Sequence, residues 1–306
     1  MKSFSQLKKI IKNDFTGYKP IKLAILGDSA TQFLAIAIRG TGYSEKLDIE
    51  TWEADFNQIE RQVFDTSSEL YDFKPDIVLI FFSSQKLLAK YNKLKPADYN
   101  SFATNHLELV ERIYQNISTN LPAKIIYYNH PEINDAVFGS FANKTEASFL
   151  FQLRKINFRL MEFAVSTNIF FITDISSVQN QTGKTNLFQP SVYINSEMVL
   201  SIDVLPQIAA DTVTLINALQ GSFKKCVIID LDNTTWGGII GDDGIEHIQI
   251  GSLGIGKAFT EFQYWIKKLQ QRGIIVAVCS KNTESVAREP FEKHPDMVLK
   301  LDDIAV

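Results

Sequence analysis

The feature that most constrains the fold is a regular alternation of short apolar runs with longer segments of helical periodicity. Runs such as 21–29 and 75–83 are rich in Ile, Leu and Val and end at Gly, Asp or Ser, as buried strands do. Strands separated by helices of ordinary length predict a parallel sheet with helices on both faces. The strands expected on this basis are 21–29, 47–54, 75–83, 123–129, 168–174, 225–232, 274–280 and 296–301, and the main helices 30–43, 97–120, 145–167, 206–221, 254–273 and 283–294.

A domain boundary is expected after Gly221. The helix at 206–221 has Pro at its start and Gly at its end, and the strand–helix cycle begins again beyond it. A chain of 306 residues is long enough for two domains. We therefore expect domains at 1–220 and 221–306. The second holds only three strands, so it is expected to be the N-terminal part of a larger α/β domain.

Bulk properties exclude several classes of function. A net charge of −4 and a pI near 5.7 argue against nucleic-acid binding, which needs a basic patch. The charged N-terminus does not resemble a signal peptide, and no apolar run approaches the ~20 residues of a membrane span. Cys226 and Cys279 lie inside apolar runs, where cysteines are usually packing residues. The sequence thus predicts a cytoplasmic protein without disulfides or a membrane partner.

Two carboxylates mark the end of the first strand of the second domain. Asp230 and Asp232 are two positions apart, so an ideal strand places them on one face. Parallel sheets bind ligands at the carboxyl ends of their strands, and adjacent carboxylates need a cation or hydrogen-bond donors to offset their repulsion. Mg²⁺ would supply the charge, and a carboxylate can attack phosphorus. For an isolated pair, the alternative is a surface turn or a helix cap.

The stretch DLDNTTWGG, which begins at Asp230, resembles motif I (D-x-D-x-T) of the haloacid dehalogenase (HAD) superfamily. The resemblance implies that Asp230 is the nucleophile, and that Asp232 is the general acid/base and offers its backbone carbonyl to Mg²⁺. Thr234 is then the third motif position. Ser280, at the end of the next strand, matches motif II, the residue that binds the transferring phosphoryl group.

A narrower resemblance covers nearly all of 224–303. The stretches DLDNTTWGGIIGDDGIEHIQIG, VCSKN and FEKHPDMVLKLDD look like the FkbH-like branch (subfamily IIIC) of the HAD phosphatases. In that branch the Trp-Gly-Gly segment begins a flap beside the site. The segment 239–248 is expected to form a flap hairpin with its turn at Asp243-Gly244. Lys281 and Asn282 either contact the substrate phosphate or only begin a helix.

The chain also departs from the family pattern. HAD phosphatases need a motif III Lys and a motif IV acidic pair, and both follow the segment that matches 297–303 here. Asp302 and Asp303 resemble motif IV but align upstream of it, so they are not expected to bind metal, and Lys300 is not the motif III Lys. The sequence therefore predicts a C-terminally truncated fragment with weak Mg²⁺ binding and little phosphatase activity.

The first domain carries GDSAT, which resembles block I (G-D-S-x-T) of the SGNH hydrolases and includes Asp28 and Ser29. The resemblance implies a flavodoxin-like, three-layer fold. A working site needs a His near the domain's end, but 201–207 contains none, and the oxyanion block G-x-N-D is missing after 75–83. His130 is the only stand-in. Ser29 is thus interpreted as a helix-capping or ligand-contacting residue of a vestigial site.

The segment 56–80 looks like the SGNH-like extension of FkbH-like proteins. The combined resemblance implies a Mg²⁺-dependent phosphatase that forms an aspartyl-phosphate. Characterised members remove phosphate from a phosphoglyceryl group and pass the glyceryl unit to an acyl carrier protein. The expected partners are thus a small phosphorylated substrate and an acyl carrier protein. The alternatives are a generic small-molecule phosphatase, a carrier- or acyl-binding module, and an active SGNH esterase.

Overall fold

The chain divides into two compact units. The computed structural model describes residues 1–305, and the units are Met1–Leu219 (unit 1) and Gln220–Val306 (unit 2). The boundary expected between positions 220 and 221 lies one residue from this division. Among the described residues, no helix combines the length and the apolar character needed to cross a membrane.

Unit 1 is built on a parallel sheet of five strands in the order β2-β1-β3-β4-β5. Each strand coincides with an apolar run expected from the sequence. The strand order reverses between β1 and β3, which makes the carboxyl ends of these two strands the place where such folds bind ligands. The strands are β1 (Lys19–Gly27), β2 (Leu47–Glu53), β3 (Ile77–Phe81), β4 (Lys124–Tyr128) and β5 (Phe170–Thr173).

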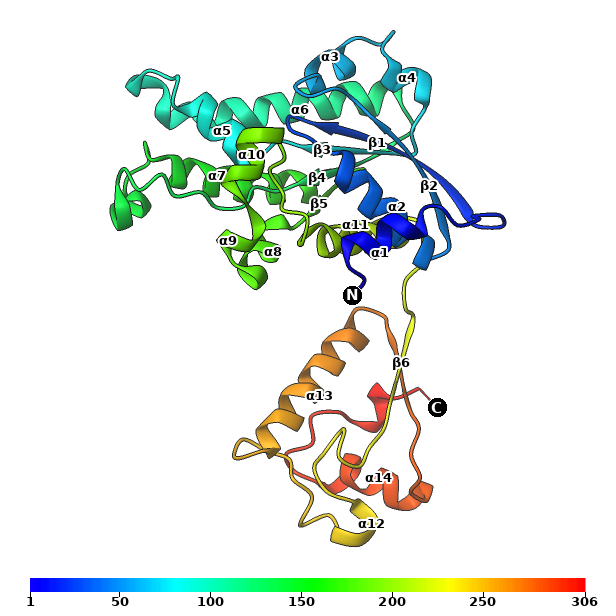
Figure 1. Cartoon of the computed structure of the whole chain (residues 1–306). Helices are drawn as coiled ribbons and strands as arrows, with labels where there is room; N and C mark the ends of the chain where they lie inside the picture. The colour runs from blue at the N-terminus through cyan, green and yellow to red at the C-terminus, as the bar shows by residue number, and fades with distance from the viewer. Residues whose placement is uncertain (306) are drawn as a thin grey trace. The chain divides into compact units, whose positions relative to one another are not determined.

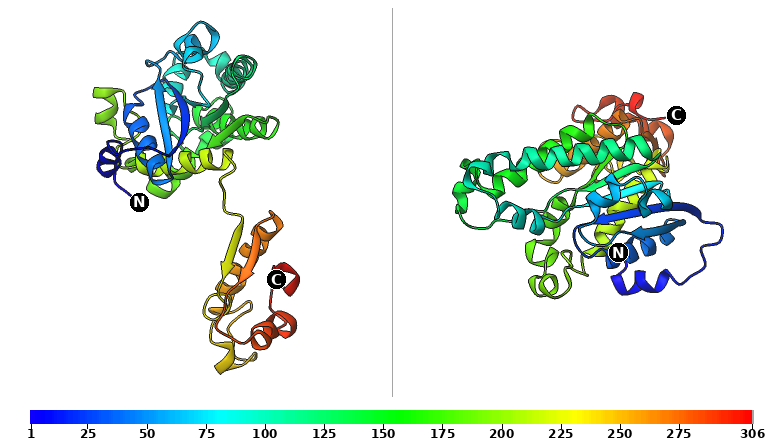
Figure 2. Two further views of the ribbon diagram at one scale, coloured as in Figure 1. Left: turned by 90° about the vertical axis from the view of Figure 1, so that its right-hand side faces the viewer. Right: turned by 90° about the horizontal axis from the view of Figure 1, so that it is seen from above.

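Helices cover both faces of this sheet (Figures 1 and 2). The alternation within β1 shows why: Leu23 and Ile25 pack into the cluster that contains α2 and α11, whereas Ala24 and Leu26 face the cluster of α6 and α7. A strand buried on both faces has no polar side, hence its continuous apolar run. The expected three-layer α/β fold is confirmed. The helices are α1 (Phe4–Ile10), α2 (Gln32–Ser44), α3 (Ile59–Phe64), α4 (Glu69–Phe73), α5 (Ser84–Tyr91), α6 (Phe102–Asn120), α7 (Phe149–Val165), α8 (Ile175–Thr182), α9 (Lys184–Leu187), α10 (Pro190–Ser196) and α11 (Leu205–Leu219), with 3₁₀ turns at Pro96–Ser101 and Gly139–Lys144.

Unit 2 has a two-stranded parallel sheet of β6 (Cys226–Ile229) and β7 (Ile275–Val278), which Figure 2 shows side by side. Its helices are α12 (Ile240–Asp243), α13 (Gly256–Gln271) and α14 (Glu284–Lys293), and a 3₁₀ turn spans Leu301–Asp303.

The strand expected at 296–301 is not formed. The backbone N–H groups of Val298 and Leu299 donate instead to Oε1 of Gln263 on α13, at 2.9 and 3.2 Å. The Gln263 side chain thus accepts the hydrogen bonds that a neighbouring strand would have accepted. The segment is therefore bonded to α13 and not to the sheet at these residues.

One face of the two-stranded sheet is uncovered. Ile229 and Val276 point into the core of unit 2, but Ile228 is 67% exposed and Ile275 52%. Cys226 lies on the same face as Ile228, and both cysteines are exposed. The expectation that both cysteines are packing residues is therefore wrong. An apolar run indicates a strand, but only the tertiary structure shows whether both of its faces are covered.

Candidate active site

The parallel pairing of β6 and β7 brings the predicted residues to one edge of the sheet. Ile229, the last residue of β6, lies opposite Val278, the last of β7. Asp230 follows β6 directly, and Ser280 stands two positions beyond β7. Because the strands run in the same direction, the segments that carry these residues leave the sheet at the same end (Figure 1).

Asp232 is held by three hydrogen-bond donors. Oδ1 accepts from the backbone N–H of Ile240 at 3.1 Å and from the indole N–H of Trp236 at 3.2 Å. Oδ2 accepts from Nδ2 of Asn282 at 2.8 Å. These contacts fix the orientation of the carboxylate in the half-buried site.

Asp230 is exposed, and hydrogen bonds connect it to Leu231 and Thr235. Its Oδ1 accepts from the N–H of Leu231 at 2.8 Å, and its carbonyl accepts from Oγ1 of Thr235 at 2.6 Å. Its Oδ2 accepts no hydrogen bond from a described residue. A rigid backbone with an open carboxylate oxygen is the arrangement that a nucleophile needs.

Asn282 connects this strand end with that of β7. Its backbone N–H donates to Oγ of Ser280 at 3.2 Å, and its Nδ2 lies 3.3 Å from the same oxygen. Of the two residues expected after motif II, Asn282 therefore belongs to the site. Lys281 is exposed at its edge, with no hydrogen bond or ion pair to the side chain of a described residue.

The glycines of the motif serve a tight loop. Asn233 and Gly238 both have positive φ, at 53° and 95°. Their backbones are joined by an N–H to carbonyl bond of 3.2 Å, and Oδ1 of Asn233 accepts from the N–H of Gly238 at 3.0 Å. A Cβ on Gly238 would meet Oδ2 of Asp243 at 2.7 Å, and that oxygen is needed to accept from Ile239. Glycine is therefore required by space as well as by conformation.

The flap expected as a hairpin at 239–248 is not a hairpin. The segment begins with the short helix α12. After it, a single antiparallel bridge pairs Gln249 with Gly237 of the motif loop. Asp243 ends α12 and bonds back to Ile239 across the turn, so the Asp-Gly pair terminates a helix instead of linking two strands.

Thr234, the third position of the motif, is exposed, and its side chain forms no hydrogen bond with a described residue. Its neighbour Thr235 is buried and bonds to the Asp230 carbonyl. Gln263 supports it from α13 by donating from Nε2 to the Thr235 carbonyl at 2.8 Å. Sequence reasoning missed both Thr235 and Gln263. The one available signal was a Gln within the apolar stripe of α13.

The oxygen donors at this edge fit a hard cation such as Mg²⁺. Asp230 offers its carboxylate, and the Asp232 carbonyl accepts no hydrogen bond from a described residue. No group of three or more His, Cys, Asp or Glu side chains among residues 1–305 could hold a metal. The Asp303 carboxylate pairs with Lys267 at 2.9 Å and accepts from the Lys300 N–H, so it is engaged by other groups. The oxygen donors available among the described residues are thus the Asp230 carboxylate and the backbone carbonyl of Asp232.

The second candidate site lies at the end of β1, in unit 1. Both carboxylate oxygens of Asp28 lie 3.0 Å from the backbone N of Ser83, at the end of β3. Burial raises the pKa of Asp28 to about 6, although the bonds from Ser83 act in the opposite direction. Asp28 therefore joins β1 to β3 at the switch point of the sheet.

Ser29 has neither a base nor a capping role. It is 1% exposed, and its Oγ has no hydrogen-bond partner among the described residues. The N-cap of α2 is Thr31, so the helix-capping interpretation of Ser29 is wrong. His130 bonds through Nε2 to the Tyr127 hydroxyl at 3.1 Å, and burial lowers its pKa to about 3. Among residues 1–305, Ser29 thus has no histidine partner of the kind that an esterase needs.

The fold and the two strand-end sites define a protein of two α/β units, with an aspartate pair at the carboxyl end of the second sheet. Residues 22–217 match the family model described as FkbH, N-terminal domain. The chain belongs to the FkbH family, as the sequence predicted.

A solved structure supports this assignment over the whole chain. It is the N-terminal part of the protein BF1531 from Bacteroides fragilis, which contains a phosphatase domain and is complexed with Mg. Identity is 49%, the TM-score is 0.93, and the match covers 100% of this chain and 81% of that one. The cofactor that the sequence predicted is thus present in this relative.

Other solved structures match only part of the chain, and weakly. A lipolytic protein of the G-D-S-L family from Desulfitobacterium hafniense is 10% identical, with a TM-score of 0.38, and covers 64% of this chain and 99% of its own. The C-terminal catalytic domain of peptidoglycan O-acetyltransferase A from Streptococcus pneumoniae is 16% identical, with a TM-score of 0.35 and coverages of 67% and 96%. Neither adds to the assignment. No curated protein matches the chain.

Proposed function

We propose that unit 2 carries the nucleophile and the acid/base of a Mg²⁺-dependent phosphatase of the HAD type. The observation that carries this proposal is the double contact of Asn282, which lies 2.8 Å from Asp232 and 3.3 Å from Ser280. Asp232 resembles a motif I residue and Ser280 the motif II residue, and both are hydrogen-bonded to Asn282, which lies 50 positions beyond Asp232. The Mg-bound phosphatase domain of the Bacteroides relative supports the same reaction class.

The reaction follows from the two aspartates. Oδ2 of Asp230 attacks phosphorus, a bond forms from this oxygen to phosphorus, and the bond to the leaving oxygen breaks. Asp232 gives the leaving oxygen a proton. Water then attacks the aspartyl-phosphate, Asp232 takes its proton, and inorganic phosphate leaves with Asp230 regenerated. The Ser280 hydroxyl donates to a phosphoryl oxygen in both steps.

Mg²⁺ would be held by the Asp230 carboxylate and the Asp232 carbonyl, where it supplies positive charge to offset that of the phosphoryl group. The hydrogen bonds from Trp236, Ile240 and Asn282 hold the Asp232 carboxylate in one orientation. Each Asp232 oxygen retains lone pairs beyond those that accept these bonds, so a proton can be carried there.

The test uses acetyl phosphate with and without Mg²⁺. We expect slow, Mg²⁺-dependent phosphate release and a phosphoryl mass increase on the peptide that contains Asp230 after acid quenching. Asp230→Asn removes both signals. Asp242→Asn, an exposed carboxylate of α12, is the matched control and retains them. Absence of both signals in the unaltered chain, or their survival in Asp230→Asn, would contradict the proposal.

We further propose that the substrate is a phosphoglyceryl compound and that the glyceryl unit passes to an acyl carrier protein. The exposure of Cys279 supports this, because a thiol able to take an acyl group directly precedes Ser280. The N–H of Cys279 donates to the Ile229 carbonyl at 3.0 Å, which ties it to the end of β6.

Carrier binding separates this proposal from the alternatives. Asp230→Asn should abolish phosphate release but leave the affinity for an acyl carrier protein unchanged in a titration. A generic small-molecule phosphatase shows no carrier binding in either form. A binding module without chemistry binds the carrier and releases no phosphate even before substitution.

A further inference from the structure

A cavity of about 250 Å³ lies in unit 1, beside the ends of β3 and β4. Its walls are mainly apolar, and Phe81 and Leu200 contribute to them together with Leu187 of α9 and Phe188. Polar side chains also line it, among them Gln85 from α5 and Lys184 from α9. The volume is below the ~300–1,000 Å³ of sites for drug-sized ligands, so the cavity suits a short chain rather than a nucleotide.

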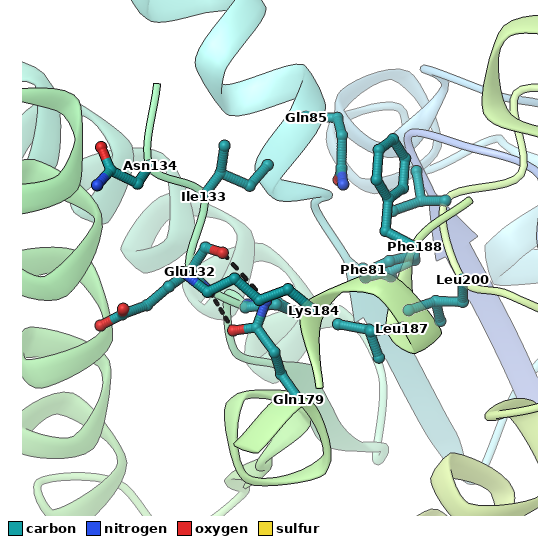
Figure 3. A pocket seen from close by; sticks show the side chains of 12 residues that line it. Phe81, Gln85, Glu132, Ile133, Asn134, Gln179, Lys184, Leu187, Phe188 and Leu200 are labelled. Carbon is teal, nitrogen blue, oxygen red and sulfur yellow. Dashed lines mark hydrogen bonds between the residues drawn. The ribbon is translucent and has the colours of Figure 1, made fainter. Parts of the chain in front are cut away.

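Hydrogen bonds hold two walls in place. Gln179 of α8 accepts from the backbone N–H of Glu132 at 2.7 Å and donates to its carbonyl at 3.0 Å, as the dashed lines in Figure 3 show. On the other side, the N–H of Ser201 donates to the Leu187 carbonyl at 2.9 Å. The cavity is therefore formed without a ligand, as small-molecule sites usually are.

Gln85 places an acceptor without a partner in the wall of this cavity. Its Oε1 is buried and has no hydrogen-bond partner among the described residues. In Figure 3 its side chain descends from α5 to a point between Ile133 and Phe188. The other amides are occupied, since Gln179 bonds to Glu132 and Oδ1 of Asn134 accepts from Ala136 at 2.9 Å. A buried acceptor without a donor destabilises the fold, and a ligand hydroxyl would satisfy it.

The charge at the cavity is positive. The Glu132 carboxylate is engaged by the guanidinium of Arg154, with Nε to Oε1 at 2.5 Å and Nη2 to Oε2 at 3.0 Å. Lys184 forms no ion pair with a described residue and is exposed. The cavity thus combines an apolar interior, an acceptor that lacks a donor, and an exposed cation.

We propose that this cavity binds a short-chain hydroxycarboxylate. The alkyl chain packs against Phe81, Leu187 and Leu200, the hydroxyl donates to Oε1 of Gln85, and the carboxylate pairs with Lys184. This binding site involves no covalent step and does not rest on the phosphatase proposed for unit 2.

The test is calorimetric titration of the whole protein with 3-hydroxyhexanoate, hexanoate and glycerol. Hexanoate lacks the hydroxyl, and glycerol lacks both chain and charge. We expect 3-hydroxyhexanoate to bind roughly threefold to tenfold more tightly than hexanoate, the difference that one hydrogen bond provides. Glycerol should show no binding at the same concentrations.

Two variants locate the contacts. Gln85→Leu should remove the preference for 3-hydroxyhexanoate but retain hexanoate binding, whereas Gln115→Leu, an exposed position on α6, changes neither. Lys184→Gln should weaken both acids equally, and Lys144→Gln is its control. Binding of neither acid, equal affinity for both, or a preference that survives Gln85→Leu would overturn the proposal. Thermal unfolding of each variant checks that unit 1 remains folded.

Discussion

Nδ2 of Asn282 lies 2.8 Å from Oδ2 of Asp232 and donates a hydrogen bond to it. The same nitrogen lies 3.3 Å from Oγ of Ser280. One amide therefore connects the segments that follow β6 and β7, and the orientation of the proposed acid/base depends on a residue from the other strand end.

Replacement of Asn282 by Ala should slow Mg²⁺-dependent phosphate release from acetyl phosphate roughly 10- to 100-fold. The substitution removes a hydrogen bond to a carboxylate, worth about 1.5–3 kcal/mol, and this bond orients Asp232. Lys281→Ala, next to it but without a side-chain contact to Asp232, should have a smaller effect. An equal loss in the two variants would show that Asn282 has no special role.

Gln263→Leu should lower the free energy of unfolding of unit 2 by about 2–4 kcal/mol, because it leaves buried backbone groups without partners. The amide satisfies the Thr235 carbonyl and the N–H groups of Val298 and Leu299. Urea unfolding followed by tryptophan fluorescence measures the change. Gln271→Leu, at the exposed end of α13, is the control and should stay within ~0.5 kcal/mol of the unaltered protein. If Gln263→Leu also changed the free energy of unfolding by less than ~0.5 kcal/mol, the structural role of Gln263 would be contradicted.

Asp28 should make unit 1 less stable as the pH rises from about 4 to 6. Its folded pKa of about 6 lies above the ordinary 3.8, so the folded state keeps the proton longer than the unfolded state does. Below this window ionisation has no effect, and above it the full penalty, roughly 3 kcal/mol, applies. Asp28→Asn cannot ionise, so its stability relative to the unaltered protein should increase across the window. Urea unfolding at pH 4, 5, 6 and 7 measures this difference, and a constant difference would exclude the effect.

His130 should remain neutral in the folded protein down to a pH near 3. Burial lowers its pKa to about 3, whereas an unfolded histidine titrates near 6.5. Because the unfolded state binds the proton first, this residue adds stability as the pH rises from about 3 to 6.5. The NMR resonances of the His130 imidazole should not shift between pH 4.5 and 8. They should titrate once urea unfolds the chain. A midpoint near 6 in the folded protein would contradict the burial argument.

Ser29→Ala should leave the hydrolysis of p-nitrophenyl acetate at the background rate of the unaltered protein. Oγ of Ser29 has no partner, and His130 bonds to Tyr127 rather than to this serine. Esterase activity that disappears in Ser29→Ala would revive the SGNH hypothesis. Thermal unfolding of the variant provides the control for folding.

The order of strands and helices in unit 1 could be read from the sequence because strands buried on both faces need unbroken apolar runs. The same rule was wrong at 296–301, where Gln263 takes the backbone donors of an apolar segment. It was also wrong for Cys226 and Cys279, since an apolar run does not reveal whether a helix covers each face.

By itself, the sequence determined the family, the parallel α/β class and the aspartate pair at a strand end, because these depend on local periodicity and on motif spacing. Only the tertiary structure decided which neighbours complete the sites. Asn282 rather than Lys281 reaches Asp232, Thr235 rather than Thr234 holds Asp230, and Ser29 is buried without a base. Contacts of this kind depend on which elements meet at the sheet edge and in which direction each side chain points, and adjacent residues on a turn point in different directions.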